Sequence, residues 1–204
     1  MSGQRYTRAV NSTAAVLEKP EGDSTPAFDL RGHADAVFEA VSPYEGDGFR
    51  NHCKRLFHFA SMLMAQRGVE MDGDVAYAIA MWHDLGIVSE KDEGQNYLRR
   101  SLSLFERETQ GVDLGDVDSK TISECLLYNH RLLSVPGLGN TAECFRQAVQ
   151  IEHSRGLLRF GLSKAAVKTK FEEYPRANFD RVLMDFTWRT LKREPLSIVN
   201  GVFF

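Results

Sequence analysis

The residues best suited to chemistry are a histidine and an aspartate that follow a strongly apolar segment. His83 and Asp84 come directly after the run AYAIAMW. If that run is a helix, it is buried on nearly all sides, and an imidazole and a carboxylate buried together there are costly without a partner. A divalent metal ion is such a partner, because it accepts a neutral histidine nitrogen and an ionised carboxylate together. Gly86 is expected to let the chain turn away and leave the metal side open.

Two further histidines strengthen this interpretation. A single His-Asp pair is more simply a local hydrogen-bonded pair at a helix end. However, His52 opens a segment whose apolar residues follow it at helical spacing, so it stands at the head of a buried face. His130 ends a segment with the same kind of face. The apolar residues on these two faces are Leu56, Phe59 and Leu63, and Ile122 and Leu126.

The elements that must position these residues are helices. From residue 32 onward the apolar pattern is helical, with capping residues at several segment starts, and no window shows strand alternation. The sequence therefore predicts an all-α fold with one helical domain. The predicted helices cover residues 33–41, 50–67, 74–86, 95–109, 119–131, 141–159, 163–173 and 178–193.

The domain organisation follows from composition along the chain. Residues 1–31 are rich in Ser, Thr, Gly and Pro and predict a loosely ordered arm, with one short helix near Ala9–Glu18. Residues 32–194 form the helical domain. Residues 195–204 are an apolar tail that we expect to pack on the domain or on a partner subunit, after Pro195 ends the last helix.

Composition excludes several classes of protein. With 43% hydrophobic and 26% charged residues among 204, the chain is typical of a globular protein. A net charge of -3 argues against a nucleic-acid partner. The three cysteines form no CxxC pair, which favours a reducing, cytoplasmic setting. The most apolar run, 75–88, is too short to span a bilayer, so no membrane partner is expected.

The order of these residues resembles the HD superfamily of metal-dependent hydrolases. The phrases RNHCKRLFHFA and AMWHDLGIV are similar to its first two motif segments, and GLLRFGLSKAAVKTKFEEYPRANFD to the back half of a bacterial subfamily. The resemblance covers most of residues 33–193 and implies an HD-type helical bundle. It implies that His52, His83 and Asp84 are metal ligands. His130 matches a position that helps hold a second ion in two-metal members and faces the substrate in one-metal members.

The chain departs from the HD pattern at the distal aspartate, for which the corresponding stretch reads QAVQIEHSRG. Glu152 is the best substitute as a metal ligand, since it follows Phe145, Ala148 and Val149 on one helical face. His153 is the alternative. An ion pair between Glu152 and an arginine of another helix explains this glutamate equally well.

A second departure is a missing histidine between His-Asp and His130, where two-metal members carry one. That region reads RRSLSLFERET, which contains no histidine, so only Glu106 or Glu108 could take the place of the missing ligand. A solvated helix face explains these two residues better. We therefore expect one divalent metal ion per chain, with Zn, Mn, Fe, Ni and Co all open.

Basic residues beside the expected ligands point to an anionic substrate. Arg55 lies three residues after His52, close to the same helix face, and Arg50 and Arg131 flank His52 and His130. Guanidinium groups hold phosphate well, so all three are candidates for substrate binding. For Arg50 a solvated helix charge is an equal explanation.

The expected activity is metal-assisted addition of water to a small phosphate ester or nucleotide. Asp84 would orient the nucleophile, and His130 would stabilise charge or move a proton. The substrate class follows from the resemblance alone. Three alternatives stay open: a hydratase of a small nitrile-type compound such as cyanamide, a di-iron oxygenase, and a degenerate HD domain that only binds a ligand or partner. A homo-oligomer is also open.

Overall fold

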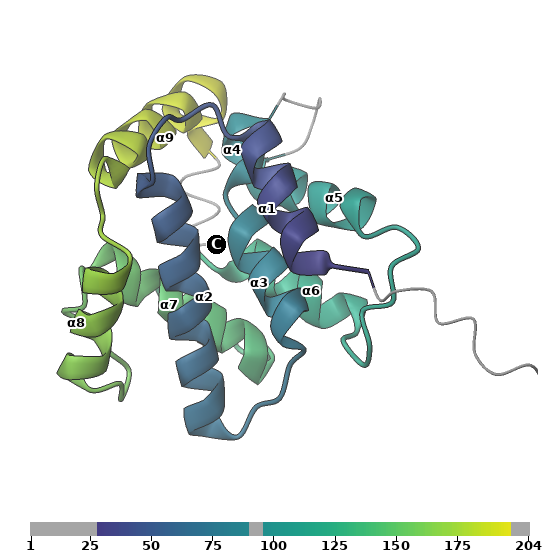
Figure 1. Cartoon of the computed structure of the whole chain (residues 1–204), viewed down its shortest axis with the longest axis vertical. Coiled ribbons are helices and arrows are strands. Elements are labelled where there is room, and N and C mark those ends of the chain that lie inside the picture. Colours follow the sequence, from purple (N-terminus) through teal and green to yellow (C-terminus); the bar gives the residue numbers. More distant parts are fainter. Residues whose placement is uncertain (1–27, 90–95, 197–204) are drawn as a thin grey trace, which may run out of the picture.

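The described part of the chain is helical throughout. The computed structural model describes residues 28–89 and 96–196, and no strand occurs among them, which confirms the all-α prediction. In chain order the helices are α1 (Leu30–Val41), α2 (Gly48–Arg67), α3 (Gly73–Trp82), α4 (Leu85–Val88), α5 (Tyr97–Glu108), α6 (Ser119–Tyr128), α7 (Asn140–His153), α8 (Lys164–Glu173) and α9 (Phe179–Arg193) (Figure 1).

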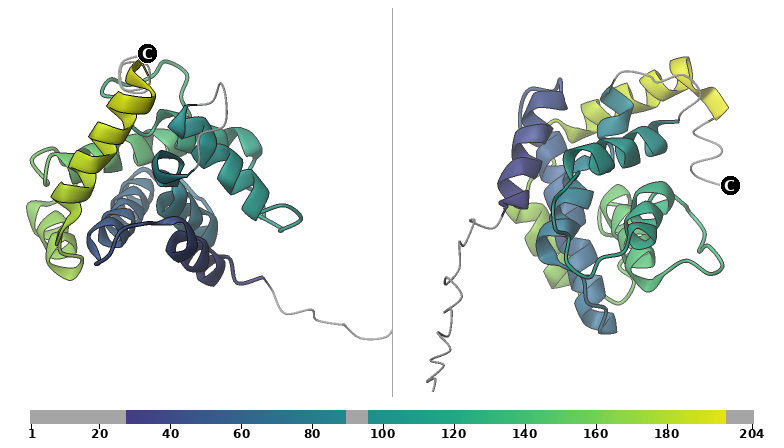
Figure 2. Two further views of the ribbon diagram at one scale, coloured as in Figure 1. Left: turned by 90° about the horizontal axis from the view of Figure 1, so that it is seen from above. Right: turned by 90° about the vertical axis from the view of Figure 1, so that its right-hand side faces the viewer.

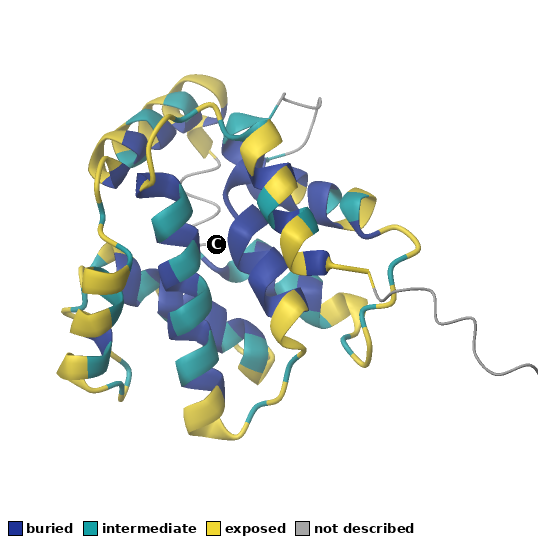
Figure 3. Cartoon of the chain, in the orientation of Figure 1, coloured by how far each residue is buried: buried dark blue, intermediate teal, exposed yellow. Residues whose placement is uncertain are grey.

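Helix α2 is the centre of the packing. It contacts α3, α7, α8 and α9, with α8 and α9 on one side and α1, α3 and α5 on the other (Figures 1 and 2). Buried residues gather where α2 packs against α3 and against α7 (Figure 3). Every residue of α3 from Val75 to Trp82 is buried, as its apolar sequence predicts. Burial of one large apolar side chain stabilises the fold by about 1.5–3 kcal/mol.

Capping side chains fix where the helices begin. At the start of α3 the Asp72 carboxylate accepts from the backbone N–H groups of Asp74 and Val75, at 2.8 and 3.0 Å. Asp118 and Ser163 cap α6 and α8 in the same way. One such cap contributes about 1 kcal/mol to stability.

Two predicted helices extend four or more residues beyond the observed ends. The segment predicted over 74–86 ends at Trp82, and His83 and Asp84 form a turn before the short α4. The segment predicted over 141–159 ends at His153. Beyond it, Arg155 and Gly156 have φ values of 53° and 78°, which an α-helix excludes.

The role expected of Gly86 is wrong. Gly86 is buried inside α4, where its backbone lies against α5. A Cβ atom on Gly86 would lie 2.0 Å from the Tyr97 carbonyl oxygen and 2.7 Å from the Ser101 nitrogen. Glycine is therefore needed for the close approach of two helices, and not for a turn of the chain.

Replacing Gly86 with alanine should lower the free energy of unfolding by about 1–3 kcal/mol, because the methyl group meets backbone atoms that cannot yield. Urea denaturation measures this. Gly73→Ala is the matched control, since its Cβ would meet only the flexible tip of Arg31, at 3.3 Å. Equal loss of stability in both variants would contradict the packing explanation.

The ends of the chain test only part of the predicted organisation. Helix α1 begins at Leu30, so the predicted arm boundary at residue 31 falls slightly late. The expected short helix near Ala9–Glu18 and the tail beyond residue 196 lie outside the described residues. Helix α9 ends at Arg193, before Pro195, as expected. Over residues 28–89 and 96–196, no helix has both the length and the apolar character needed to cross a bilayer.

Candidate metal centre

The fold brings His52, His83 and Asp84 together. Helices α2 and α3 pack side by side and are joined by residues 68–72, so they run in opposite directions. The first turns of α2, which carry His52, therefore lie beside the end of α3, where His83 and Asp84 follow. All three side chains are buried.

Three potential ligand atoms meet at one point. The Nε2 atoms of His52 and His83 are 3.2 Å apart. Asp84 Oδ2 lies 3.1 Å from His83 Nε2 and 3.5 Å from His52 Nε2. Ligands at about 2.0–2.2 Å from a tetrahedral ion are about 3.3–3.6 Å apart. The observed spacing fits a small divalent cation.

The protonation of the His83 ring also suits a metal ligand. His83 Nδ1 lies 2.8 Å from the Ala80 carbonyl oxygen, which can only accept, so Nδ1 carries the proton and Nε2 a lone pair. Burial lowers the pKa of His83, which favours this neutral form. Burial would lower the pKa of His52, but Glu152, 3.1 Å from Nδ1, and Asp84 outweigh it and raise the pKa. The His83 lone pair and the Asp84 carboxylate therefore both face His52 Nε2, and a cation bound at this point would take the place of the proton that otherwise lies between them.

Asp84 joins this cluster to His130. Its second oxygen, Oδ1, lies 2.9 Å from His130 Nε2. Burial alone would raise the pKa of Asp84, but His83 and His130 outweigh it and hold the pKa well below its usual range. Asp84 is therefore an ionised carboxylate whose Oδ2 atom faces His52 and His83 and whose Oδ1 atom faces His130. The His130 side chain is 12% exposed, so solvent reaches the cluster here.

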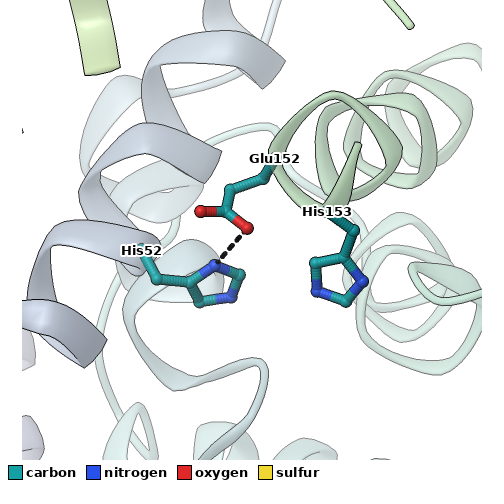
Figure 4. Close-up of side chains that lie close together, drawn as sticks. All are labelled: His52, Glu152 and His153. Carbon is teal, nitrogen blue, oxygen red and sulfur yellow. Dashed lines mark ion pairs between the residues drawn. The ribbon is translucent and has the colours of Figure 1, made fainter. Parts of the chain in front are cut away.

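Glu152 comes from the last turn of α7 and is held by arginines. Its Oε1 atom accepts from Arg55, with Nε at 3.1 Å, and from Arg176 Nη1 at 2.9 Å. Its Oε2 atom points at His52 (Figure 4). Burial would raise the pKa of Glu152, but His52 and Arg55 outweigh it and lower the pKa. The ion pair with arginine, expected as an alternative, is present.

This arrangement argues against Glu152 as a ligand beside His83 and Asp84. Glu152 faces Nδ1 of His52, whereas His83 and Asp84 face Nε2. The lone pairs of the two ring nitrogens diverge, so one ion cannot reach both sides of the ring. Glu152 instead lies on the far side of the His52 ring, the position that carboxylates behind metal-bound histidines commonly take.

His153, the alternative ligand, lies at the open side of the cluster. Its side chain is exposed, and its ring centre lies 5.9 Å from that of His52 and 5.7 Å from that of His130. His52, Glu152 and His153 also offer ligand atoms within 4.8 Å of one another (Figure 4). Since two arginines already compensate the charge of Glu152, this group is the weaker candidate for a cation.

Arg55 does not occupy the substrate position expected for it. The residue is fully buried, and its guanidinium donates to Glu152 and to the Tyr174 carbonyl oxygen. Burial lowers its pKa, and Glu152 opposes that change. The three-residue spacing from His52 does place Arg55 on nearly the same helix face, but that face is the core side. A substrate phosphate cannot reach it.

Arg50 and Arg131, the other two arginines expected to bind substrate, differ in whether a carboxylate pairs with them. Arg50 pairs with Asp35 at 3.2 Å and with Glu39, both on α1, so it ties α1 to α2. Arg131 lies 5.6 Å above the Tyr128 ring, and its buried Nε has no hydrogen-bond partner among the described residues. Of the three arginines, Arg131 alone makes no ion pair with a carboxylate of the described residues.

Two residues behind His52 were not expected. The Phe179 ring stacks on the His52 ring, with centres 4.1 Å apart and planes 11° from parallel. The Arg176 guanidinium lies 5.0 Å over Phe179 and also binds Glu152. Both lie more than 120 residues after His52, and neither carries a local sequence signal that points to it.

The comparisons with known proteins give no relative for this site. No model of a known protein family matches the chain, and no curated protein or solved structure matches it either.

Proposed function

We propose that the protein is a metal-dependent hydrolase with an HD-type helical bundle. The observation that supports this most is the buried meeting of His52 Nε2, His83 Nε2 and Asp84 Oδ2 within 3.5 Å of one another, with the His83 proton held on the other side of its ring by the Ala80 carbonyl oxygen. Two buried imidazoles and an ionised carboxylate that converge in this way are a ligand set suited to a divalent metal ion.

In this proposal His52, His83 and Asp84 hold one divalent ion, which supplies a water of lowered pKa and polarises an electrophile. Asp84 Oδ1 and His130 Nε2, at 2.9 Å, share a proton beside that point. Because His130 is partly exposed, it can pass the proton to a leaving group or to solvent. Arg131, the next residue, has no carboxylate partner among the described residues and is the candidate cation for an anionic substrate.

The proposal includes one ion. On α5, Glu106 is exposed, and Glu108 lies 3.2 Å from His33 Nε2, so neither reaches the histidine cluster. This placement counts against a di-iron oxygenase. We favour a small phosphate ester or nucleotide as the substrate.

A hydratase of a small nitrile-type compound is the second candidate. Two of the three arginines expected to bind phosphate, Arg50 and Arg55, pair with carboxylates instead. Of the three, only Arg131 has no carboxylate partner among the described residues. A neutral, compact substrate such as cyanamide needs no such cationic wall.

Turnover by metal-loaded protein distinguishes these possibilities. The substrates are p-nitrophenyl phosphate, a set of nucleoside monophosphates, and cyanamide with urea release as the readout. We expect hydrolysis of at least one phosphate ester, and its loss in Asp84→Asn, which removes a ligand charge. Urea release alone would favour the hydratase. Equal rates in the wild type and Asp84→Asn for every compound would contradict both.

A further inference from the structure

A second group of cations surrounds a groove between the α7–α8 connection and α8. The groove has a volume of about 390 Å³, a size suited to a small organic ligand. Its basic residues come from both walls, and its remaining residues are apolar or glycine. The lining residues are Arg155, Gly156, Leu157, Arg159, Lys164, Val167, Lys168 and Phe171.

The four cations of this groove differ in how far they are neutralised. Arg155 pairs with Asp180 at 3.0 Å, and Lys168 pairs with Glu172 one turn along α8. No ion pair or hydrogen bond within the described chain engages the side chains of Arg159 and Lys164, and both residues are exposed. No acidic residue lines the groove. An anion entering it therefore meets uncompensated positive charge.

The floor of the groove is apolar and partly open to solvent. Val167 is buried and Phe171 is half-buried. Leu157, which lies between Arg155 and Arg159 in the sequence, is 83% exposed. Leu157, Val167 and Phe171 share this lining, so a ligand with an apolar body would remove apolar surface from water here. The groove thus offers apolar contact and positive charge in the same place.

The connection that forms one wall has an unusual backbone. Arg155 and Phe160, with φ values of 53° and 46°, occupy the left-handed region that bulky residues rarely adopt. Gly156 supports this shape, since a Cβ there would lie 2.7 Å from Val167 Cγ1. The wall is thus fixed tightly on α8, in a conformation of the kind that proteins retain at binding sites.

We propose that this groove is a binding site for a small amphiphilic anion, a molecule with a phosphate or carboxylate head and a short apolar body. Arg159 and Lys164 bind the head, assisted by Arg155 and Lys168. The apolar body lies along Leu157 and Phe171. The site is separate from the metal centre, and its ligand need not be the substrate.

Calorimetric titration of the full chain with octyl phosphate below its micellar concentration tests the proposal. We expect saturable binding with one molecule per chain that weakens with added salt. Inorganic phosphate and octanol carry only the head or only the body, and each should bind at least about tenfold more weakly.

The variant Arg159→Gln/Lys164→Gln should weaken octyl phosphate binding at least about tenfold. The matched control is Arg99→Gln/Lys120→Gln, which removes two exposed cations from α5 and α6 and should bind like the wild type. Leu157→Ser should weaken octyl phosphate but not inorganic phosphate.

Several outcomes would overturn this site. The proposal is wrong if octyl phosphate shows no saturable binding to the wild type, or if it binds the two double variants with equal affinity. If the protein sediments with phosphatidylserine vesicles but does not bind octyl phosphate, the surface is a membrane contact, and the proposal is also wrong.

Discussion

Glu152→Ala is expected to lower the free energy of unfolding by about 3–5 kcal/mol, because it leaves the buried Arg55 guanidinium without its counter-charge. Such a loss is a large part of the stability of an ordinary domain. Urea denaturation of the metal-free protein measures it. Glu172→Ala is the control, since it removes an exposed pair with Lys168 and should change stability by less than about 1 kcal/mol. Similar losses in both variants would contradict the role given to Glu152.

If Glu152→Ala does not fold, Glu152→Gln keeps the shape and removes only the charge. A carboxylate that orients His52 from outside should, when neutralised, weaken metal binding about 10–100-fold without changing the number of ions bound. Complete loss of the ion in Glu152→Gln would instead make Glu152 a ligand, as the sequence suggested.

His130→Ala is expected to lower the rate of hydrolysis by about 10²–10⁴-fold while the metal content stays unchanged. The reason is that His130 contacts Asp84 through Oδ1, whereas Oδ2 faces His52 and His83. The rate is measured on whichever compound the metal-loaded wild type turns over. His58→Ala is the matched control, because His58 lies elsewhere, 3.1 Å from the Tyr174 hydroxyl. A normal rate in His130→Ala, or loss of its metal, would rule out the proton-transfer role.

The convergence of His52, His83 and Asp84 could be predicted because each residue stands at the end of an apolar face. Helical spacing fixes that face, and burial brings such faces together. The same reasoning singled out Glu152, since its face is also apolar. It could not assign the role of Glu152, which depends on which nitrogen of the His52 ring it meets.

Other features depend on contacts between distant segments, which spacing alone does not contain. Arg55 shares a helix face with His52, but its partner carboxylate, Glu152, comes from α7. The sequence does not show that α7 packs against this face. Gly86 suits a turn as well as a close helix contact, and the approach of α5 decides between them. Phe179 stacks on His52 from a helix that the sequence located correctly, without any pattern that marks the contact.

The most direct test of the metal centre is elemental analysis of the purified wild type beside His83→Ala, with circular dichroism to show that both are folded. We expect about one equivalent of a divalent metal ion per wild-type chain and almost none in His83→Ala, because that variant removes one of three ligands at a single point. A folded wild type that retains no ion and binds none on addition of Zn, Mn, Fe, Ni or Co salts would contradict the account. Equal metal content in the two proteins would contradict it as well.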